Sequence, residues 1–342
     1  MSRYAFVLPG RGSYTEASLG TLNRAATEPE ARAFLDEVEA WRASYGLPAL
    51  LELDGAERFS AATHLRPANV SALIWACTLL DVRAERARRA DQQLVAVAGN
   101  SMGWYTALAV GGALGLEDGF RLVQEVALMQ EANRGGGQLI YPIMGANWRP
   151  DPARRAQVEA ALASGGRDVF PSIELGGFRV LAGSDAGMAH LMGALPPIAA
   201  GELGRAAYPL RLAQHGPYHT RLLSDVAQRA QNSLARLDWR APEVTLVDGR
   251  GSLFTPWSTS TRELIGYTLG HQITRPYDLN RSVRVVLREL APDQLVLPGP
   301  GNTLGGITGQ ILCLEGWRGV HTRADFERVQ ESGTPLVHSL QR

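Results

Sequence analysis

A serine lies between two glycines at residues 99–103, in the stretch Gly-Asn-Ser-Met-Gly. The apolar residues 93–99 before it predict a buried strand, and the residues from 104 onward predict a helix. Gly-x-Ser-x-Gly between a strand and a helix is typical of a nucleophile elbow, a sharp turn that exposes the serine hydroxyl. We therefore predict Ser101 as a nucleophile, with a structural turn as the alternative. The backbone N–H of Met102, at the start of the helix, would stabilise an oxyanion.

A serine hydroxyl needs a base, and one of the seven histidines is well placed for that role. The stretch "QHGPYHTRLL" at 214–223 contains a Pro-containing turn, an aromatic residue and then His219. We expect His219 at the point where a loop becomes a helix, from which its side chain can face a cleft. The alternative is a histidine that caps or packs against that helix.

The composition disfavours several functional classes. The chain has 342 residues, of which 45% are hydrophobic, which is enough for one large domain or two smaller ones. A formal net charge of zero disfavours nucleic-acid binding through a basic field. No apolar stretch approaches the roughly 20 residues that span a bilayer, and the first residues do not resemble a signal peptide. Two cysteines suit a reducing cytosol, so we expect a cytoplasmic protein without membrane or nucleic-acid partners.

Two further patterns favour no additional cofactor site. No cluster of His, Asp or Glu has convincing metal-ligand spacing, so we expect no metal. The glycine-rich residues 298–309 lack the Lys-Ser/Thr ending of a phosphate-binding loop. We interpret that segment as a structural turn.

The elements that must position these side chains alternate between strands and helices, which predicts an α/β main body. Between about 136 and 210, shorter strands and helices alternate, which predicts a small inserted α+β subdomain. The predicted strands lie at 4–10, 93–99, 137–147, 176–184, 244–249 and 293–301. The predicted helices lie at 29–43, 67–90, 104–114, 116–134, 152–164, 185–195, 217–237, 262–273 and 279–290.

Several stretches, in order along nearly the whole chain, resemble the malonyl-CoA:acyl carrier protein transacylases and the acyltransferase domains of polyketide synthases. The resemblance implies a hydrolase-like α/β large subdomain made of residues 1–135 and 208–342, and a ferredoxin-like small subdomain at 136–207. The active site would lie in the cleft between them. The stretches that carry the resemblance are "FVLPGRGSY", "GNSMGWYTAL", "LMQEA", "HGPYHTRLL", "HQITRPYDLNRSV" and "LPGPGNTLGGIT".

The resemblance implies acyl transfer in polyketide or fatty acid biosynthesis. Ser101 would take the acyl group from acyl-CoA, and the phosphopantetheine thiol of an acyl carrier protein would accept it, with His219 as the base in both steps. CoA and phosphopantetheine would be substrates, with no permanently bound cofactor. A backbone carbonyl near Gln272 or Asp278 would position the histidine, and the backbone N–H of Arg11 would be the second oxyanion donor. The alternative is a hydrolase that clears acyl groups from carrier proteins.

One departure from the family pattern concerns the substrate. Glu125 stands where malonyl-using relatives carry an arginine that pairs with the free carboxylate of the substrate. A carboxylate there would repel malonyl, so the sequence favours an acyl group without a carboxylate, and an amine-bearing acyl group is an alternative. Alternatively, Glu125 pairs with Arg121 one helical turn away. Arg121 and Arg134 are near but lack the family position.

Three other residues are predicted to contact the substrate, and one segment is predicted to contact a partner. Asn100 replaces the histidine of the elbow motif, and Tyr218 lies where related domains carry a short specificity motif; with Gln272, both are predicted substrate-binding residues. Because carrier proteins are acidic, the arginine-rich residues 83–89 are a candidate docking surface. The alternative for that segment is an ordinary solvated helix end.

Overall fold

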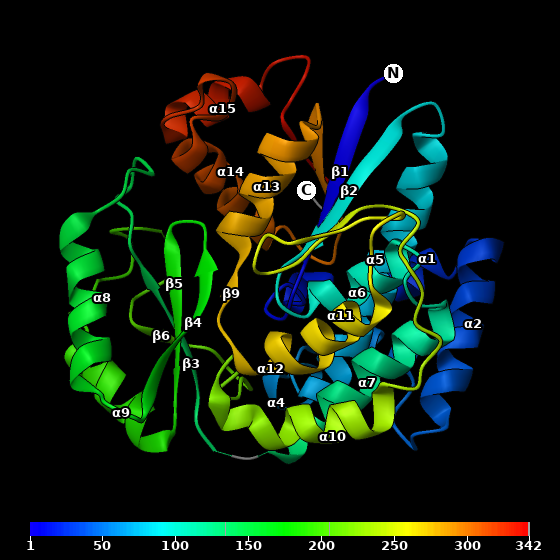
Figure 1. Ribbon diagram of the computed structural model, residues 1–342, viewed down its shortest axis with the longest axis horizontal. Coiled ribbons are helices and arrows are strands. Elements are labelled where there is room, and N and C mark those ends of the chain that lie inside the picture. The colour runs from blue at the N-terminus through cyan, green and yellow to red at the C-terminus, as the bar shows by residue number, and fades with distance from the viewer. Residues whose placement is uncertain (134, 205, 341–342) are drawn as a thin grey trace.

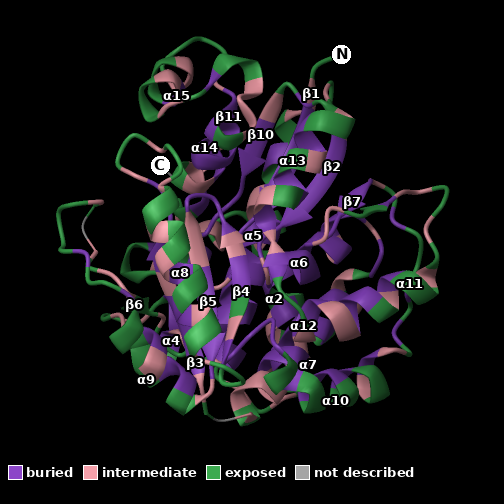
Figure 2. Cartoon of the chain, turned by 60° about the vertical axis from the view of Figure 1, so that its left-hand side comes forward, coloured by how far each residue is buried: buried purple, intermediate pink, exposed green. Residues whose placement is uncertain are grey.

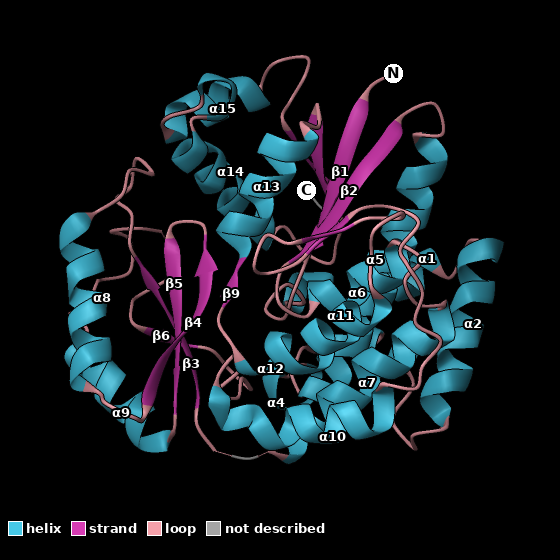
Figure 3. Cartoon of the chain, in the orientation of Figure 1, coloured by secondary structure: helices cyan, strands magenta, loops and turns pink. Residues whose placement is uncertain are grey.

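The strands of the protein form two separate sheets, as Figures 1 and 3 show in the same orientation. The computed structural model describes residues 1–133, 135–204 and 206–340. The larger sheet has the order β11-β10-β1-β2-β7-β8, and all its neighbouring strands are parallel except β7 and β8. Its strands are β1 (Arg3–Leu8), β2 (Gln93–Gly99), β7 (Leu246–Val247), β8 (Leu253–Phe254), β10 (Gln294–Leu297) and β11 (Val337–Ser339).

The smaller sheet is antiparallel apart from one edge. Its order is β6-β3-β5-β4-β9, and only the pair β4–β9 is parallel. Its strands are β3 (Gly137–Pro142), β4 (Val169–Leu175), β5 (Phe178–Gly183), β6 (Leu210–Arg211) and β9 (Tyr277–Asp278). The structure is therefore a mixed α/β fold with two sheets.

The smaller sheet has two apolar faces, because successive side chains of a strand point to opposite sides. Leu139 and Leu181 face the helices α8 (Pro152–Ser164) and α9 (Asp185–Ala194), with which they form a separate small core. These two helices lie beside the sheet on the left of Figure 1. Ile140 and Val180, one position away, pack toward the main core instead. The sheet thus presents an apolar face toward the larger part of the molecule.

The main core is built around the buried strands of the larger sheet, which are purple in Figure 2. Parallel strands covered by helices are apolar along most of their length, and β1 is buried from Tyr4 to Leu8. The helices of this part are α1 (Thr21–Ala25), α2 (Pro29–Ala43), α3 (Leu50–Asp54), α4 (Ala61–His64), α5 (Pro67–Arg88), α6 (Gly103–Val110), α7 (Leu116–Ala132), α10 (Ser224–Leu234), α11 (Thr261–Gly266), α12 (Gln272–Thr274), α13 (Leu279–Leu290), α14 (Thr303–Glu315) and α15 (Arg323–Gln330).

Most predicted elements are present, but the segment around the candidate base differs. The helix predicted from 217 begins only at Ser224. His219 has a left-handed backbone with φ of 59°, which does not fit a helix, and Pro217 precedes it. A short 3₁₀ turn at Arg221–Leu223 separates His219 from the helix α10. His219 therefore lies in a loop.

The smaller sheet also extends beyond the predicted boundaries of the insert. Strand β6 lies past the predicted end of the insert at residue 207. Strand β9 lies about 100 residues after its partner β4 along the chain. Strand β4 was not predicted, because Pro171 and a register shift beside it interrupt its apolar alternation. Among the described residues, no helix is long and apolar enough to cross a membrane.

Candidate functional site

Ser101 sits in a turn that only its glycine neighbours permit. The serine has a φ of 53°, in the left-handed region that side-chain-bearing residues rarely adopt. A Cβ on Gly99 would overlap the backbone of Gly103, and a Cβ on Gly103 would lie 2.5 Å from the carbonyl oxygen of Leu8. Close approach of β1, β2 and α6 therefore requires both glycines. The turn lifts the serine hydroxyl out of the sheet, as a nucleophile elbow does.

The structure brings His219 to this serine from 118 residues along the chain. Ser101 Oγ lies 2.7 Å from His219 Nε2. On the other side of the ring, His219 Nδ1 lies 2.7 Å from the backbone carbonyl oxygen of Gln272. A carbonyl can only accept, so Nδ1 carries the proton and Nε2 presents a lone pair to the serine hydroxyl. The arrangement is that of a serine nucleophile with an oriented general base.

The carbonyl of Gln272 is available because the helix ends there. In a continuing α-helix it would accept from the N–H of residue 276, but that residue is Pro276, which has none. Arg275 is correspondingly extended, as residues before proline tend to be. The Gln272 side chain donates to the Ser101 carbonyl at 2.8 Å and accepts from Tyr267 Oη at 2.9 Å. One residue thus holds both members of the pair.

The surroundings keep the His219 imidazole neutral. Its pKa is lowered from 6.5 to about 4, mainly by burial and to a smaller extent by the charges of Arg11 and His271, while the bond to the Gln272 carbonyl acts in the opposite direction. A buried imidazole with a low pKa is unprotonated at neutral pH. His219 is therefore ready to accept a proton.

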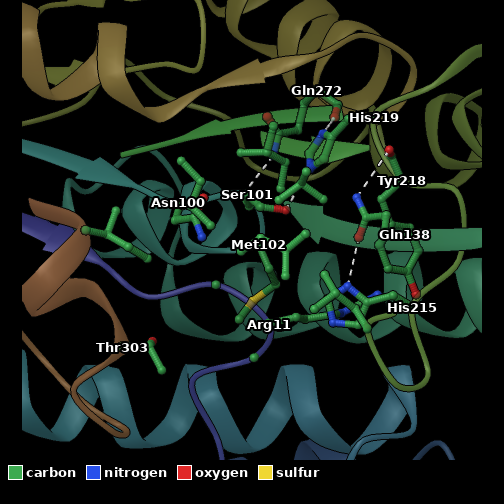
Figure 4. Close-up of a pocket in the computed structure, with 18 of the residues that line it drawn as sticks. Arg11, Asn100, Ser101, Met102, Gln138, His215, Tyr218, His219, Gln272 and Thr303 are labelled. Carbon is green, nitrogen blue, oxygen red and sulfur yellow. Dashed lines mark hydrogen bonds between the residues drawn. The ribbon is translucent and has the colours of Figure 1, made fainter. Parts of the chain in front are cut away.

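A cavity of about 200 Å³ opens beside this pair, between the two sheets (Figure 4). One wall is apolar and is formed by the inner face of the smaller sheet, where Ile140, Ile173 and Val180 lie. Thr303, Leu304 and Ile307, at the start of α14, also line the cavity. The glycine-rich segment interpreted as a structural turn therefore also contributes part of the site.

Most residues singled out from the sequence line this cavity. Ser101 and His219 do, together with Met102, Arg11, Asn100, Tyr218 and Gln272. Neither the Met102 nor the Arg11 backbone N–H donates to another described residue, which leaves both free for a substrate oxygen. The side-chain oxygen of Asn100 is buried without a partner among the described residues.

Glu125, in contrast, does not line the cavity. Its carboxylate accepts from Arg121 Nε at 2.7 Å and from Tyr45 Oη at 3.4 Å. In this structure Glu125 is therefore not placed to repel a substrate carboxylate in the cavity. It pairs with Arg121 one helical turn away, as the alternative interpretation of the sequence expected. Asp278 is not the residue that orients His219; it caps α13 by accepting from the N–H of Arg281. Arg134 lies outside the described residues.

Besides Thr303, three polar residues of the cavity were not predicted. Gln138, on β3, donates to the Tyr218 carbonyl and accepts the ring proton of His215 Nδ1 at 2.8 Å. Gln130, on α7, accepts a hydrogen bond from Arg11. The spacing of two histidines in "QHGPYH" was the one available signal for His215, whereas Gln138 lay in a segment that predicted only a strand. No group of three or more potential metal ligands occurs in the described part of the chain.

Comparison with known proteins identifies relatives across most of the chain. No protein-family model matches it. The malonyl CoA-acyl carrier protein transacylase of Escherichia coli K12 is 28% identical over 314 residues, which are 91% of this chain and 94% of that protein. The crystal structure of malonyl-CoA:acyl carrier protein transacylase from Xanthomonas oryzae is 25% identical, with a TM-score of 0.72 over 91% of this chain and 92% of that one.

A second solved structure is a complex. It contains a type II polyketide synthase acyl carrier protein bound to its malonyl-transacylase. The matching chain of that structure is 25% identical to this one, with a TM-score of 0.71 over 91% of this chain and 93% of that chain. These comparisons confirm the resemblance found in the sequence motifs.

Proposed function

We propose, on the premise that this chain is a homologue of the malonyl-CoA acyl carrier protein transacylases, that it transfers acyl groups from CoA to the phosphopantetheine thiol of an acyl carrier protein. The observation that carries the proposal is the 2.7 Å contact between Ser101 Oγ and His219 Nε2 in a nucleophile elbow. The complex of a related malonyl-transacylase with a carrier protein supports the choice of acceptor.

In the first half-reaction, Ser101 Oγ attacks the carbonyl carbon of the acyl thioester. His219 Nε2 takes the hydroxyl proton, and the carbonyl of Gln272 stabilises the resulting imidazolium through Nδ1–H. The oxyanion accepts from the backbone N–H groups of Met102, at the start of α6, and of Arg11, in the turn after β1. The C–S bond then breaks, and the leaving thiolate takes the proton from His219, which leaves an acyl ester on the serine.

In the second half-reaction, the phosphopantetheine thiol gives its proton to His219 and attacks the ester. Collapse of the second tetrahedral intermediate breaks the bond to Ser101 Oγ, which takes the proton back. Water in place of the thiol would release the free acid, which is the hydrolase alternative. The three relatives described above are named as transacylases, which does not favour hydrolysis.

Other parts of the proposal concern architecture and setting. We assign the larger sheet and its helices to a hydrolase-like unit and the smaller sheet with α8 and α9 to a ferredoxin-like insert, as the resemblance implies. A cytoplasmic location stays the prediction made from the sequence.

The test is to follow the intact mass of the protein with a panel of acyl-CoAs, with and without an acyl carrier protein. We expect an adduct of one acyl group that is absent in Ser101→Ala, present in the surface control Ser44→Ala, and moved to the carrier when the carrier is added. Release as free acid faster than transfer would support the hydrolase alternative. A protein that forms no adduct with any thioester would contradict the proposal.

A further inference from the structure

A positive charge lies at the cavity without a negative partner. Arg11 Nε donates to Ser71 Oγ at 3.0 Å and Arg11 Nη2 donates to Gln130 Oε1 at 2.6 Å, and both acceptors are neutral. Its guanidinium carbon lies 4.7 Å from the centroid of the Tyr218 ring. No ion pair of the described residues includes Arg11. A partly buried guanidinium is normally paired with a carboxylate, so this one has unused capacity for an anion.

The three contacts hold the guanidinium in place rather than neutralise it. Ser71 lies on α5 and Gln130 on α7, so two helices fix the edge of the group, while the ring of Tyr218 supports its face. Arginine side chains otherwise lose considerable freedom when they bind a ligand. A pre-ordered fork of donors is suited to a planar anion such as a carboxylate.

Among the described residues that line the cavity, Arg11 is the one charged side chain. Burial and the charge of Arg11 lower the pKa of His215 to about 3, and the pKa of His219 is lowered to about 4. Both histidines are therefore neutral, and His215 uses Nδ1–H for Gln138. Glu125, the one acidic residue that the sequence placed at the substrate, is paired with Arg121 outside the cavity.

The position of Arg11 along the chain limits which part of a substrate carries that anion. Its backbone belongs to the turn after β1, and the preceding Gly10 approaches the carbonyl of Asn100 so closely that a Cβ would overlap it. Asn100 is the neighbour of Ser101. The guanidinium is therefore tethered close to the reacting thioester, whereas the phosphates of CoA lie at the far end of the pantetheine arm. The anion must belong to the acyl group.

We propose that Arg11 is the specificity-determining residue of this site, and that it binds the free carboxylate of a short dicarboxylic acyl thioester. This inference rests on the acyl transfer proposed above. The sequence led us to expect an acyl group without a carboxylate, because Glu125 replaces the family arginine. The structure leads to the opposite expectation, because Arg11 lines the cavity and Glu125 does not. The apolar wall at Ile140 and Ile173 then accommodates the carbon chain.

The test compares two thioesters of nearly the same shape. In 3-methylbutanoyl-CoA an isopropyl group replaces the carboxylate of malonyl-CoA. We expect kcat/KM for acylation of Ser101 in the unaltered protein to favour malonyl-CoA. In Arg11→Gln, which keeps the backbone N–H and removes the charge, we expect the ratio of the two kcat/KM values to fall at least tenfold, about 1.4 kcal/mol, with most of the change in KM for malonyl-CoA.

Two further variants make the result decisive. Arg11→Lys keeps the charge but loses the fork, so its ratio should lie between those of Arg11→Gln and the unaltered protein. Arg121→Gln removes a guanidinium outside the cavity and should leave the ratio within twofold. Equal use of both thioesters by the unaltered protein, with acyl transfer intact, would overturn the role of Arg11 but not the proposed function. A protein that forms no Ser101 adduct with either thioester would overturn both.

Discussion

The pH dependence of acylation tests the environment of His219 directly. A pKa lowered from 6.5 to about 4 corresponds to roughly 3 kcal/mol in favour of the neutral imidazole, most of it from burial. The base is lost only when the pH falls through the folded pKa. We therefore expect kcat/KM for acylation to stay nearly constant from pH 7.5 down to about 5 and to fall below that, whereas an exposed histidine would give a decline near 6.5.

The assay should use an acyl-CoA whose acyl group does not titrate, such as acetyl-CoA, with quenched single-turnover acylation read by intact mass. Arg11→Gln removes one of the charges that lower this pKa, so its acid limb should move to higher pH, while Arg121→Gln should leave the limb in place. An acid limb at or above 6.5 in the unaltered protein, with circular dichroism showing an intact fold at that pH, would refute the reasoning.

The remaining predictions concern stability and the elbow. Because the pKa of His219 is depressed in the folded protein, its contribution to the free energy of unfolding is present above pH 6.5 and lost as the pH falls toward 4, so urea midpoints should decline over that window. Gln272→Leu leaves the Ser101 carbonyl without its donor and should lower the unfolding free energy by about 1–3 kcal/mol, measured by urea denaturation. Gly99→Ala should abolish acylation, because its Cβ overlaps α6. Glu125→Gln should leave the choice between malonyl-CoA and acetyl-CoA unchanged in a competition assay.

The nucleophile and the base could be predicted from sequence because local chemistry constrains both. A serine with a left-handed backbone between close-packed strands and a helix needs glycines on either side, and these glycines form a motif that can be recognised in the sequence. Pro276 likewise marks the point where a helix must stop and release a carbonyl. Such signals are local along the chain, so a single sequence is enough to predict them.

Side-chain direction could not be predicted in the same way. Glu125 occupies the motif position of an arginine, but it is drawn to Arg121 on the next turn and to Tyr45 on another segment. Arg11 was assigned only a backbone role, because a loop residue gives no periodicity from which to infer where its side chain points. Its partners, Ser71 and Gln130, lie 60 and 119 residues away. Contacts of that range are decided by packing of the whole fold.

Arg11 also connects substrate binding to the strength of the base. Its charge is one of the causes that lower the pKa of His219. If a substrate carboxylate binds the guanidinium, the two charges compensate each other, and the depression of that pKa is relieved in the complex. His219 would then be a stronger base when a dicarboxylic acyl group is bound than when the site is empty. This coupling depends on the charge of the acyl group and not on its size.

The coupling has a kinetic signature. The pH dependence of kcat/KM reports the free enzyme, whereas the rate at saturating substrate reports the complex. With malonyl-CoA, the acid limb of the saturated acylation rate should therefore lie at higher pH than the limb seen with 3-methylbutanoyl-CoA at saturation. In Arg11→Gln the limb with 3-methylbutanoyl-CoA should itself move to higher pH, since the charge of Arg11 no longer lowers the pKa of His219. Coincident limbs in the unaltered protein would mean that the carboxylate does not reach Arg11.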